Sequence, residues 1–349
     1  MGDFANTYPF LAFGGKIDPI SEIRNGGLLT SGSVFWVKDI NDSDYRTFAS
    51  QVGPANIFTD IQSAINKTRN DKNDYVFVCP KDSGAAWTNT TNVGSAILIN
   101  KARVHLISVG YGRTTTGYSN IIRGHGTAAA YDTAVVKVLA PGVEMAGFRV
   151  LGTAGTTANG TMNNILALGT ASTGTAHDFW FHDGQIDTNL ASGGGADGTP
   201  IVVTMTNATG PNGARFDNVL IGNTSAGPAQ AVSLNHIGKH HKFTNSQFMT
   251  FAGNAADILI GNGTGATNFT LFRDCEFINL DSATALNTAF LGSVTVKNPV
   301  LAYNCGAINI TAVGTDPTVY VAPSQSGTAG AGIHNPGIYL RGSAAITAA

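Results

Sequence analysis

A pattern of six residues recurs along this chain and constrains its fold more than any other feature. Each copy has an apolar residue, a variable one, Asn or Asp, a small residue, a variable one and a final apolar residue. The copies FHDGQI, FDNVLI, FTNSQF, FRDCEF and, more loosely, AYNCGA begin at residues 181, 216, 243, 272 and 302. Because one short unit is repeated, we expect stacked units rather than a single irregular core.

The spacing of the copies distinguishes between repeat architectures. Between 27 and 35 residues separate the starts of successive copies, so the period is irregular. Helical arrays keep a unit of fixed length, whereas a parallel β-helix keeps its short strands in register and lets the turns vary. Each unit also holds two short strand-like runs separated by Gly, Asn, Thr and Pro. The pattern therefore predicts an all-β chain, a right-handed parallel β-helix or solenoid.

Equivalent residues of successive coils should form ladders, because coils stack at the ~4.8 Å spacing of paired strands. The Asn or Asp position marks a tight turn, where these side chains tolerate left-handed backbone and can bond nearby backbone groups. The predicted ladder residues are Phe181, Phe216, Phe243, Phe272, Asp183, Asn218, Asn245, Asp274 and Asn304. The last apolar position predicts a second inward ladder of Ile186, Ile221, Phe248 and Phe277.

The small residue after the turn is expected to fit a crowded inward corner. This position holds Gly184, Val219, Ser246, Cys275 and Cys305. The last two would lie close together in adjacent coils, and the only other cysteine is Cys79. Three cysteines are too few for a disulfide framework, so we interpret the pair as small buried residues rather than as a bridge.

The chain divides into four predicted segments. Residues 1–32 are Gly-rich without a clear period, and we interpret them as an N-terminal arm that is either flexible or becomes ordered by docking on another protein. Residues 33–74 hold a first strand and a capping helix, and residues 75–311 form the parallel β-helix. Residues 312–349 are interpreted as a C-terminal coil or cap, with contact to another subunit as an alternative.

The capping helix is predicted within residues 56–71. Its apolar stripe consists of Ile57, Ile61, Ala64 and Ile65. Thr59 or Asp60 is suited to cap the first turn. A solenoid leaves core and strand edges open at its end, so we expect the helix to cover the first coil.

Short sequences around this helix resemble known proteins. IQSAINK followed by DYVFVCPK is similar to the start of the pectate-lyase-like superfamily of right-handed parallel β-helices. Together with GSVFWVKDI and KARVHLISVGYGR, these stretches most resemble structural virion β-helix proteins of tailed bacteriophages, over about residues 33–125. The resemblance implies the β-helix fold, a place in the virion and a homotrimer.

Composition argues against several classes of partner. Only 12% of the residues are charged and the net charge is −2, which offers no basic surface for nucleic acid. No run approaches the ~20 apolar residues of a membrane span. The first residues carry Asp3 where a secretory signal needs positive charge. We expect no nucleic-acid or membrane partner, and synthesis in the host cytoplasm without a signal peptide.

Many β-helices bind or cut polysaccharides, so catalytic residues must be considered. The candidates in this chain lie in predicted turns. Residues 123–126 read RGHG and contain the Gly-His-Gly of polygalacturonases, but the other motifs of that family are missing, so we interpret His125 as a turn residue. A glycosidase would need two carboxylates, which Asp178 and Asp187 would supply only by meeting across a turn. An arginine such as Arg123 or Arg149 would have to converge with them.

We therefore predict no catalytic set, no metal and no cofactor. The residues that come nearest to a catalytic set are Asp178, His182, Asp187 and His125. His236, His240 and His241 have metal-compatible spacing but lack a carboxylate or thiolate companion.

The predicted function is that of a structural virion protein of a tailed phage, a rigid β-helical capsid decoration, spike or fibre module. We expect a homotrimer that contacts other shell or tail proteins through residues 1–32. One alternative is a polysaccharide-degrading enzyme, a lyase or glycoside hydrolase of the depolymerase kind. Another is a non-catalytic module that binds a surface glycan, which requires exposed aromatic residues among Trp87, Tyr118 and Trp180.

Overall fold

The computed structural model describes residues 32–88, 96–109, 120–123, 134–151, 164–169, 176–187, 201–205, 211–222, 233–236, 239–250, 259–260, 268–279, 286–290, 300–308, 310–314, 319–321 and 338–341. The predicted N-terminal arm, apart from Gly32, lies outside this part of the chain.

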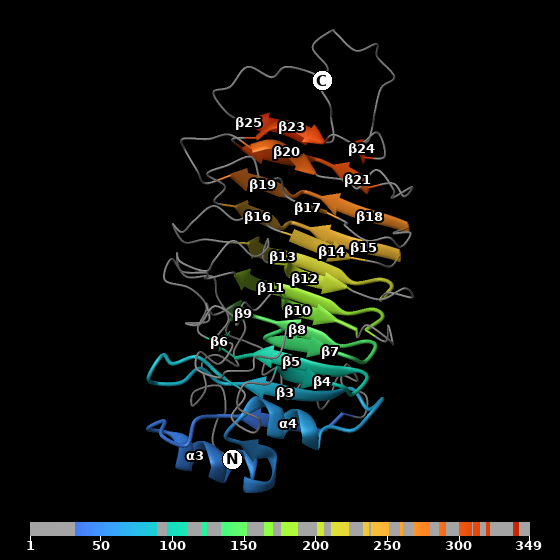
Figure 1. Ribbon diagram of the computed structural model, residues 1–349. Helices are drawn as coiled ribbons and strands as arrows, with labels where there is room; N and C mark the ends of the chain where they lie inside the picture. Colours follow the sequence, from blue (N-terminus) through green and yellow to red (C-terminus); the bar gives the residue numbers. More distant parts are fainter. Residues whose placement is uncertain are drawn as a thin grey trace, which may run out of the picture.

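The strands pair in parallel and stack along one axis, so the chain is an all-β parallel β-helix (Figure 1). The first face consists of β1 (Val34–Val37), β3 (Asp74–Val78), β5 (Val104–Ser108), β8 (Glu144–Ala146), β11 (Trp180–Asp187), β13 (Arg215–Gly222), β15 (Lys239–Thr244), β18 (Asn268–Arg273), β21 (Val300–Tyr303) and β24 (Val319–Val321). The short β2 (Ile57–Phe58) pairs with β1.

The second face belongs to the same sheet, because β11 and β13 continue around the corner onto it. Its other strands are β6 (Asn120–Arg123), β9 (Phe148–Leu151), β16 (Gln247–Thr250), β19 (Glu276–Asn279), β22 (Cys305–Ile308) and β25 (Ile338–Arg341). The third face is a separate sheet of β4 (Ile97–Ile99), β7 (Val136–Val138), β10 (Asn164–Leu168), β12 (Ile201–Met205), β14 (Ser233–His236) and β17 (Leu259–Ile260). The strands β20 (Leu286–Phe290) and β23 (Ile310–Gly314) pair with each other.

The predicted apolar ladders are confirmed. The rings of Phe216 and Phe243 stack with centroids 4.8 Å apart, and those of Phe243 and Phe272 with centroids 4.9 Å apart. Phe181 continues this ladder at 6.5 Å with a tilted ring. In the second ladder, Ile186, Ile221, Phe248 and Phe277 occupy paired positions of successive strands. All of these side chains are fully buried, so the repeated apolar positions form the core.

The Asn and Asp positions form the predicted left-handed corner. Their φ angles lie between 50° and 54° at Asp183, Asn218, Asn245, Asp274 and Asn304. Side-chain hydrogen bonds at this corner run between coils. Asn218 donates to Asp183 over 2.7 Å and Asn304 donates to Asp274 over 2.6 Å. These amides and carboxylates therefore tie neighbouring turns together.

The side chain of the small residue that follows the corner bonds a nearby backbone carbonyl. The Ser246 hydroxyl donates to the carbonyl of Thr244 over 2.8 Å. The Cys275 thiol lies 3.4 Å from the carbonyl of Arg273, and the Cys305 thiol lies 3.4 Å from that of Tyr303. Both thiols are free and buried, as predicted.

A second left-handed corner, not expected from the sequence, precedes the strands of the first face. Its residues Arg103, Gly142, Asp178, Gly213 and His240 have φ angles of 55°, 65°, 54°, 75° and 61°. Backbone bonds connect its turns, since Gly142 donates to His177 and Asp178 donates to Asn212, each over 2.8 Å. The residue types differ from coil to coil, which is why no sequence pattern marked this corner.

The N-terminal end is covered by two helices. The predicted helix is α4, shorter than expected at Ile61–Lys67, and the Asp60 side chain caps it by accepting from the Ser63 amide. It lies against β1 to β4, which confirms a capping helix (Figure 1). The side chain of Gln62 accepts from the Leu98 amide over 2.7 Å and donates to the Leu98 carbonyl over 3.1 Å. Gln62 thus bonds the backbone amide and carbonyl of Leu98 in β4, the strand at the edge of its sheet.

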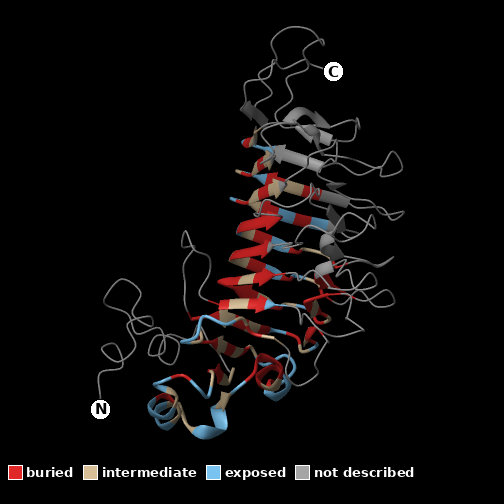
Figure 2. Cartoon of the chain, turned by 60° about the vertical axis from the view of Figure 1, so that its left-hand side comes forward, coloured by how far each residue is buried: buried red, intermediate tan, exposed pale blue. Residues whose placement is uncertain are grey.

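A further helix, α3 (Tyr45–Val52), was not predicted. Its Phe48 packs edge-on against Trp36 at 5.1 Å, on the outer side of the first sheet. Cys79 and Val109 complete this second apolar cluster. Figure 2 shows the buried residues gathered in the stacked strands and the exposed ones concentrated around the N-terminal helices and turns.

At the other end, strands continue beyond residue 311. The strands β24 and β25 pair with β21 and β22, so the stacked strands continue into residues 312–349.

Candidate functional site

The outer side of the first face carries a row of directly paired polar and aromatic residues. Tyr75 pairs with His105, His105 with Glu144, and Glu144 with Trp180. These positions point outward because the next residue of each strand, such as Leu106 or Met145, is fully buried.

Hydrogen bonds join this row into a network across β5, β8 and β11. The two oxygens of Glu144 bond different imidazoles, one 2.5 Å from Nδ1 of His105 and the other 2.9 Å from Nε2 of His182. The Nδ1 atom of His182 is 2.7 Å from a carboxylate oxygen of Asp183. Two histidines and two carboxylates therefore alternate along three coils.

Aromatic rings hold both imidazoles in place. The ring of Tyr75 stacks on His105 with centroids 4.2 Å apart and planes at 10°. The indole of Trp180 stacks on His182 with centroids 4.1 Å apart and planes at 28°. The network is thus fixed in geometry on the outer face of the solenoid.

The charges of the network are mutually stabilised. Burial opposes the charge of Glu144, but hydrogen bonds from His105 and His182 outweigh it and lower the pKa of this carboxyl to about 2. Burial likewise opposes the charge of His182, but bonds to Glu144 and Asp183 raise the pKa of its imidazole. Burial, with the nearby charge of Glu144, raises the pKa of Tyr75 to about 12.

This arrangement ties coils together rather than preparing a proton transfer. Hydrolysis of a glycosidic bond requires a carboxylic acid of raised pKa opposite a second carboxylate. Here Glu144 is held strongly ionised, and Asp183 bonds the same imidazole that Glu144 bonds. The sequence pointed to His182 and Asp183 but not to Glu144 and His105. These residues belong to three different coils, and no sequence motif connects them.

The other predicted candidates do not join this network. Asp178 is a left-handed corner residue before β11, whereas Asp187 is the last residue of that strand. The residues between Asp178 and Asp187 form a strand, so the two carboxylates do not face each other across a turn. His125 and Tyr118 lie outside the described residues.

The predicted arginines and Trp87 are also placed elsewhere. Arg123 in β6 and Arg149 in β9 stand on the second face, around the corner from His182. Trp87 is buried, and its indole nitrogen donates to Asn120 over 3.1 Å. Of the aromatic candidates that the structure describes, Trp180 is the exposed one, with 39% of its surface accessible.

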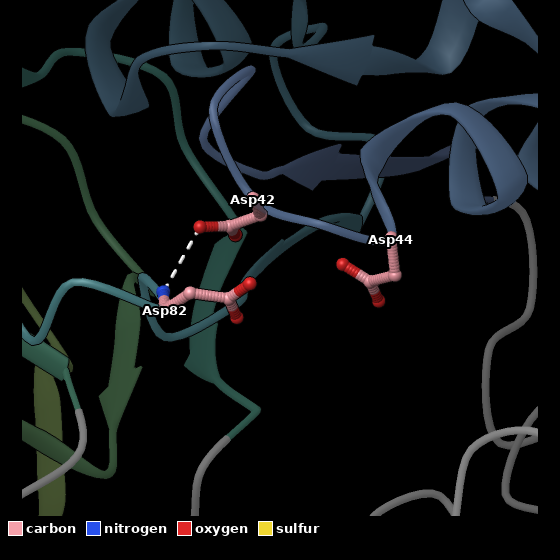
Figure 3. A group of neighbouring side chains, drawn as sticks. All are labelled: Asp42, Asp44 and Asp82. Atoms are coloured by element: carbon pink, nitrogen blue, oxygen red, sulfur yellow. Dashed lines mark hydrogen bonds between the residues drawn. The ribbon is translucent and has the colours of Figure 1, made fainter.

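Three carboxylates at the N-terminal end, those of Asp42, Asp44 and Asp82, approach within 4.8 Å of one another (Figure 3). The Lys38 ammonium lies 3.0 Å from Asp42 and 2.7 Å from Asp44, while the Asp82 amide donates to Asp42. Burial opposes the charge of Lys38, but these hydrogen bonds outweigh it and raise its pKa. Lys38 thus offsets part of the negative charge of the cluster, whose bonds join β1 and α3 to the turn after β3.

The histidines with metal-compatible spacing do not converge. His240 is exposed in the second corner, whereas His241 is fully buried on the inner side of β15. Neighbouring strand residues point to opposite sides, so the two imidazoles diverge. Among the described helices, none has the length and apolar composition needed to cross a membrane.

Comparisons with known proteins add a description of the fold. No family model matches the sequence, and no curated protein matches it. Pectin methylesterase PemA from Erwinia chrysanthemi is similar in structure with a TM-score of 0.47 and 9% identity, over 89% of this chain and 93% of that one. The pectin methylesterase from Aspergillus niger gives a TM-score of 0.46 and 11% identity, over 91% and 94%.

A phage protein is found as well. ORF18 of Geobacillus virus E2 gives a TM-score of 0.43 and 12% identity, over 87% of this chain and 60% of that one. At such low scores and identities these likenesses carry no argument about chemistry. The parallel β-helix rests on the strand pairing of this chain itself.

Proposed function

We propose that this chain is a structural component of a tailed-phage particle, a rigid β-helical module that serves as a capsid decoration, spike or fibre part. The observation that carries the proposal is the use of polar groups to join successive coils. Asn218 bonds Asp183, Asn304 bonds Asp274, and Glu144 bonds two histidines of neighbouring strands. Bonds of this kind stiffen a rod along its axis.

The sequence resemblance over about residues 33–125 supports the phage assignment. From it we also propose a homotrimer, located in the virion, that contacts shell or tail proteins through residues 1–32. The alternative of a polysaccharide-degrading enzyme is less well supported, because the ionised Glu144 and its bonded neighbours do not provide an acid and a base with separated pKa values.

Quantitative mass spectrometry of gradient-purified particles tests the proposal by counting this chain against the major shell protein. A copy number close to that of the shell identifies a decoration protein, and a few copies per particle identify a spike or fibre part. Absence of the chain from particles that contain all their other structural proteins would contradict the proposal.

A further inference from the structure

Three outward residues form a continuous strip across β11, β13 and β15. Trp180 pairs directly with Arg215, and Arg215 pairs directly with Lys242. Paired residues of neighbouring strands lie ~4.8 Å apart, so an aromatic ring and two cations follow one another along the axis of the solenoid.

The aromatic member of the strip is exposed yet held in place. Trp180 has 39% of its surface accessible. One side of its indole stacks on His182, which is itself bonded to Glu144 and Asp183. An exposed ring whose orientation is already fixed loses little conformational entropy when a ligand packs on it.

The two cations are neighbours of like charge. Arg215 and Lys242 are both exposed, and within the described part of the chain the side chain of neither has a hydrogen bond or an ion pair. Like charges directly opposite each other on paired strands are destabilising. The carboxylate of the nearby Asp217 accepts from the neutral Thr244 over 2.7 Å and from the neutral Asn245 over 3.1 Å, and it forms no described ion pair with either cation.

Another arginine of the same sheet shows the usual arrangement. Arg273, outward on β18, has its own partner in Asp274, 3.3 Å away. Unlike Arg273, both Arg215 and Lys242 have charges that are available to an external anion. The planar guanidinium of Arg215 is suited to bind a carboxylate.

We propose that this strip binds an acidic polysaccharide. A pyranose ring packs on Trp180, and the carboxylate or sulfate groups of that sugar and its neighbour bind Arg215 and Lys242. An extended polymer fits better than a small molecule, because small ligands need a concave pocket whereas this strip runs straight along an outer sheet face. Nucleic acid fits less well, because it carries a phosphate charge at every nucleotide whereas the strip offers only two cations.

Tryptophan fluorescence offers a direct test with the full chain. Of the three tryptophans, Trp36 and Trp87 are buried, so a ligand on the strip shifts mainly the emission of Trp180. Alginate, hyaluronate, polysialic acid and chondroitin sulfate are titrated, with neutral dextran and single-stranded DNA as comparisons. We expect at least one acidic polysaccharide to shift the emission to the blue, with affinity that falls as salt is added.

Variants separate the strip from the general charge of the surface. The double variant R215A/K242A should weaken binding at least tenfold, and W180F should abolish the fluorescence shift. The matched control R273A removes an exposed, paired arginine of the same sheet and should leave affinity within twofold. Circular dichroism establishes that each variant is folded.

Several results would overturn the proposal. These are no binding by any of the four acidic polymers, equal binding of dextran, tighter binding of single-stranded DNA, or an equal loss in R273A and R215A/K242A. The proposal is independent of the structural role, because the particle copy number can be measured whether or not the strip binds a glycan.

Discussion

The first coil and the middle coils of the solenoid are stabilised differently. Around β1 and β3 the sheet is covered on both sides, inside by the common core and outside by the cluster of Trp36 and Phe48. Around β13, β15 and β18 the core contains stacked phenylalanine rings, and outward residues such as Arg215 and Lys242 are exposed.

The difference follows from the number of neighbours. A middle coil has a coil on each side, and its Phe243 is stacked on the rings of both neighbours. The first coil has only one such neighbour, so α3, α4 and the lysine-bridged carboxylates take the place of the missing one. Stability in a solenoid lies mainly in the interfaces between units, and an end unit must obtain its interface elsewhere.

The largest expected effect is on the phenylalanine stack. Phe243→Ala removes a fully buried ring stacked at 4.8 and 4.9 Å on both sides, and should reduce the free energy of unfolding by about 3–5 kcal/mol. Denaturant unfolding measures this loss, and hydrogen exchange should rise in the coils on both sides of β15.

Phe48→Ala is the matched comparison, because it removes an equally buried ring from the outer cluster. We expect faster hydrogen exchange in α3 and β1 with unchanged protection of β13 to β18. If Phe48→Ala exposed the middle coils as strongly as Phe243→Ala, the contrast between the two regions would be wrong.

A smaller effect concerns pH and the network of Glu144. The pKa of this carboxyl is about 2 in the folded chain against an ordinary 4.5, so its contribution is complete above pH 4.5 and is lost as the pH falls towards 2. The raised pKa of His182 adds a contribution that is complete below 6.5 and is lost as the pH rises through that raised value. Stability should therefore be greatest between pH 4.5 and 6.5.

Thermal melts from pH 2 to 9 measure this profile. Glu144→Gln should flatten the pH profile of stability. It should lower the free energy of unfolding by about 3 kcal/mol or less near pH 5.5, because one pKa unit corresponds to about 1.36 kcal/mol. Glu276→Gln is the control, since Glu276 is an outward carboxylate bonded by the neutral Gln247. An unchanged profile in Glu144→Gln would mean that other groups govern the pH dependence.

The smallest effect separates backbone strain from side-chain bonding at the corner. Asn218 has a φ of 53° and an exposed bond to Asp183. Both Asn218→Gly and Asn218→Ala lose the bond, but only the glycine variant also removes the Cβ from left-handed backbone, so the alanine variant should be less stable than the glycine variant by roughly 1 kcal/mol. Denaturation midpoints of the two variants test this, and equal midpoints would show that the strain is relieved elsewhere.

The sequence predicted those parts of the fold in which one residue type repeats. The rings of Phe216, Phe243 and Phe272 recur at one template position, so their stack could be predicted, and Asn or Asp recurs at the first corner. Gly147, with a φ of 76°, occupies this corner in the coil of β8 and β9. It was not predicted because Ala-Gly-Phe lacks the Asn or Asp of the template. The second corner was missed because Arg, Gly, Asp and His share no pattern there.

The candidate site was less predictable because it depends on contacts between coils. Nearly forty residues separate His105 from Glu144, and nearly forty more separate Glu144 from His182. Only the register of β5, β8 and β11 brings the three together. The helix α3 was missed for a related reason, since Phe48 alone of its residues is buried and leaves too weak an apolar stripe.

The position of Gln62 has a consequence for how these molecules behave at high concentration. An uncovered first strand would offer its amides and carbonyls to the last strand of another molecule, and stacked solenoids would then grow end to end into fibrils. The carboxamide of Gln62 already occupies the Leu98 amide and carbonyl of β4. One side chain thus helps to keep each solenoid a particle of fixed length, which can be packed in large numbers without polymerising through this end.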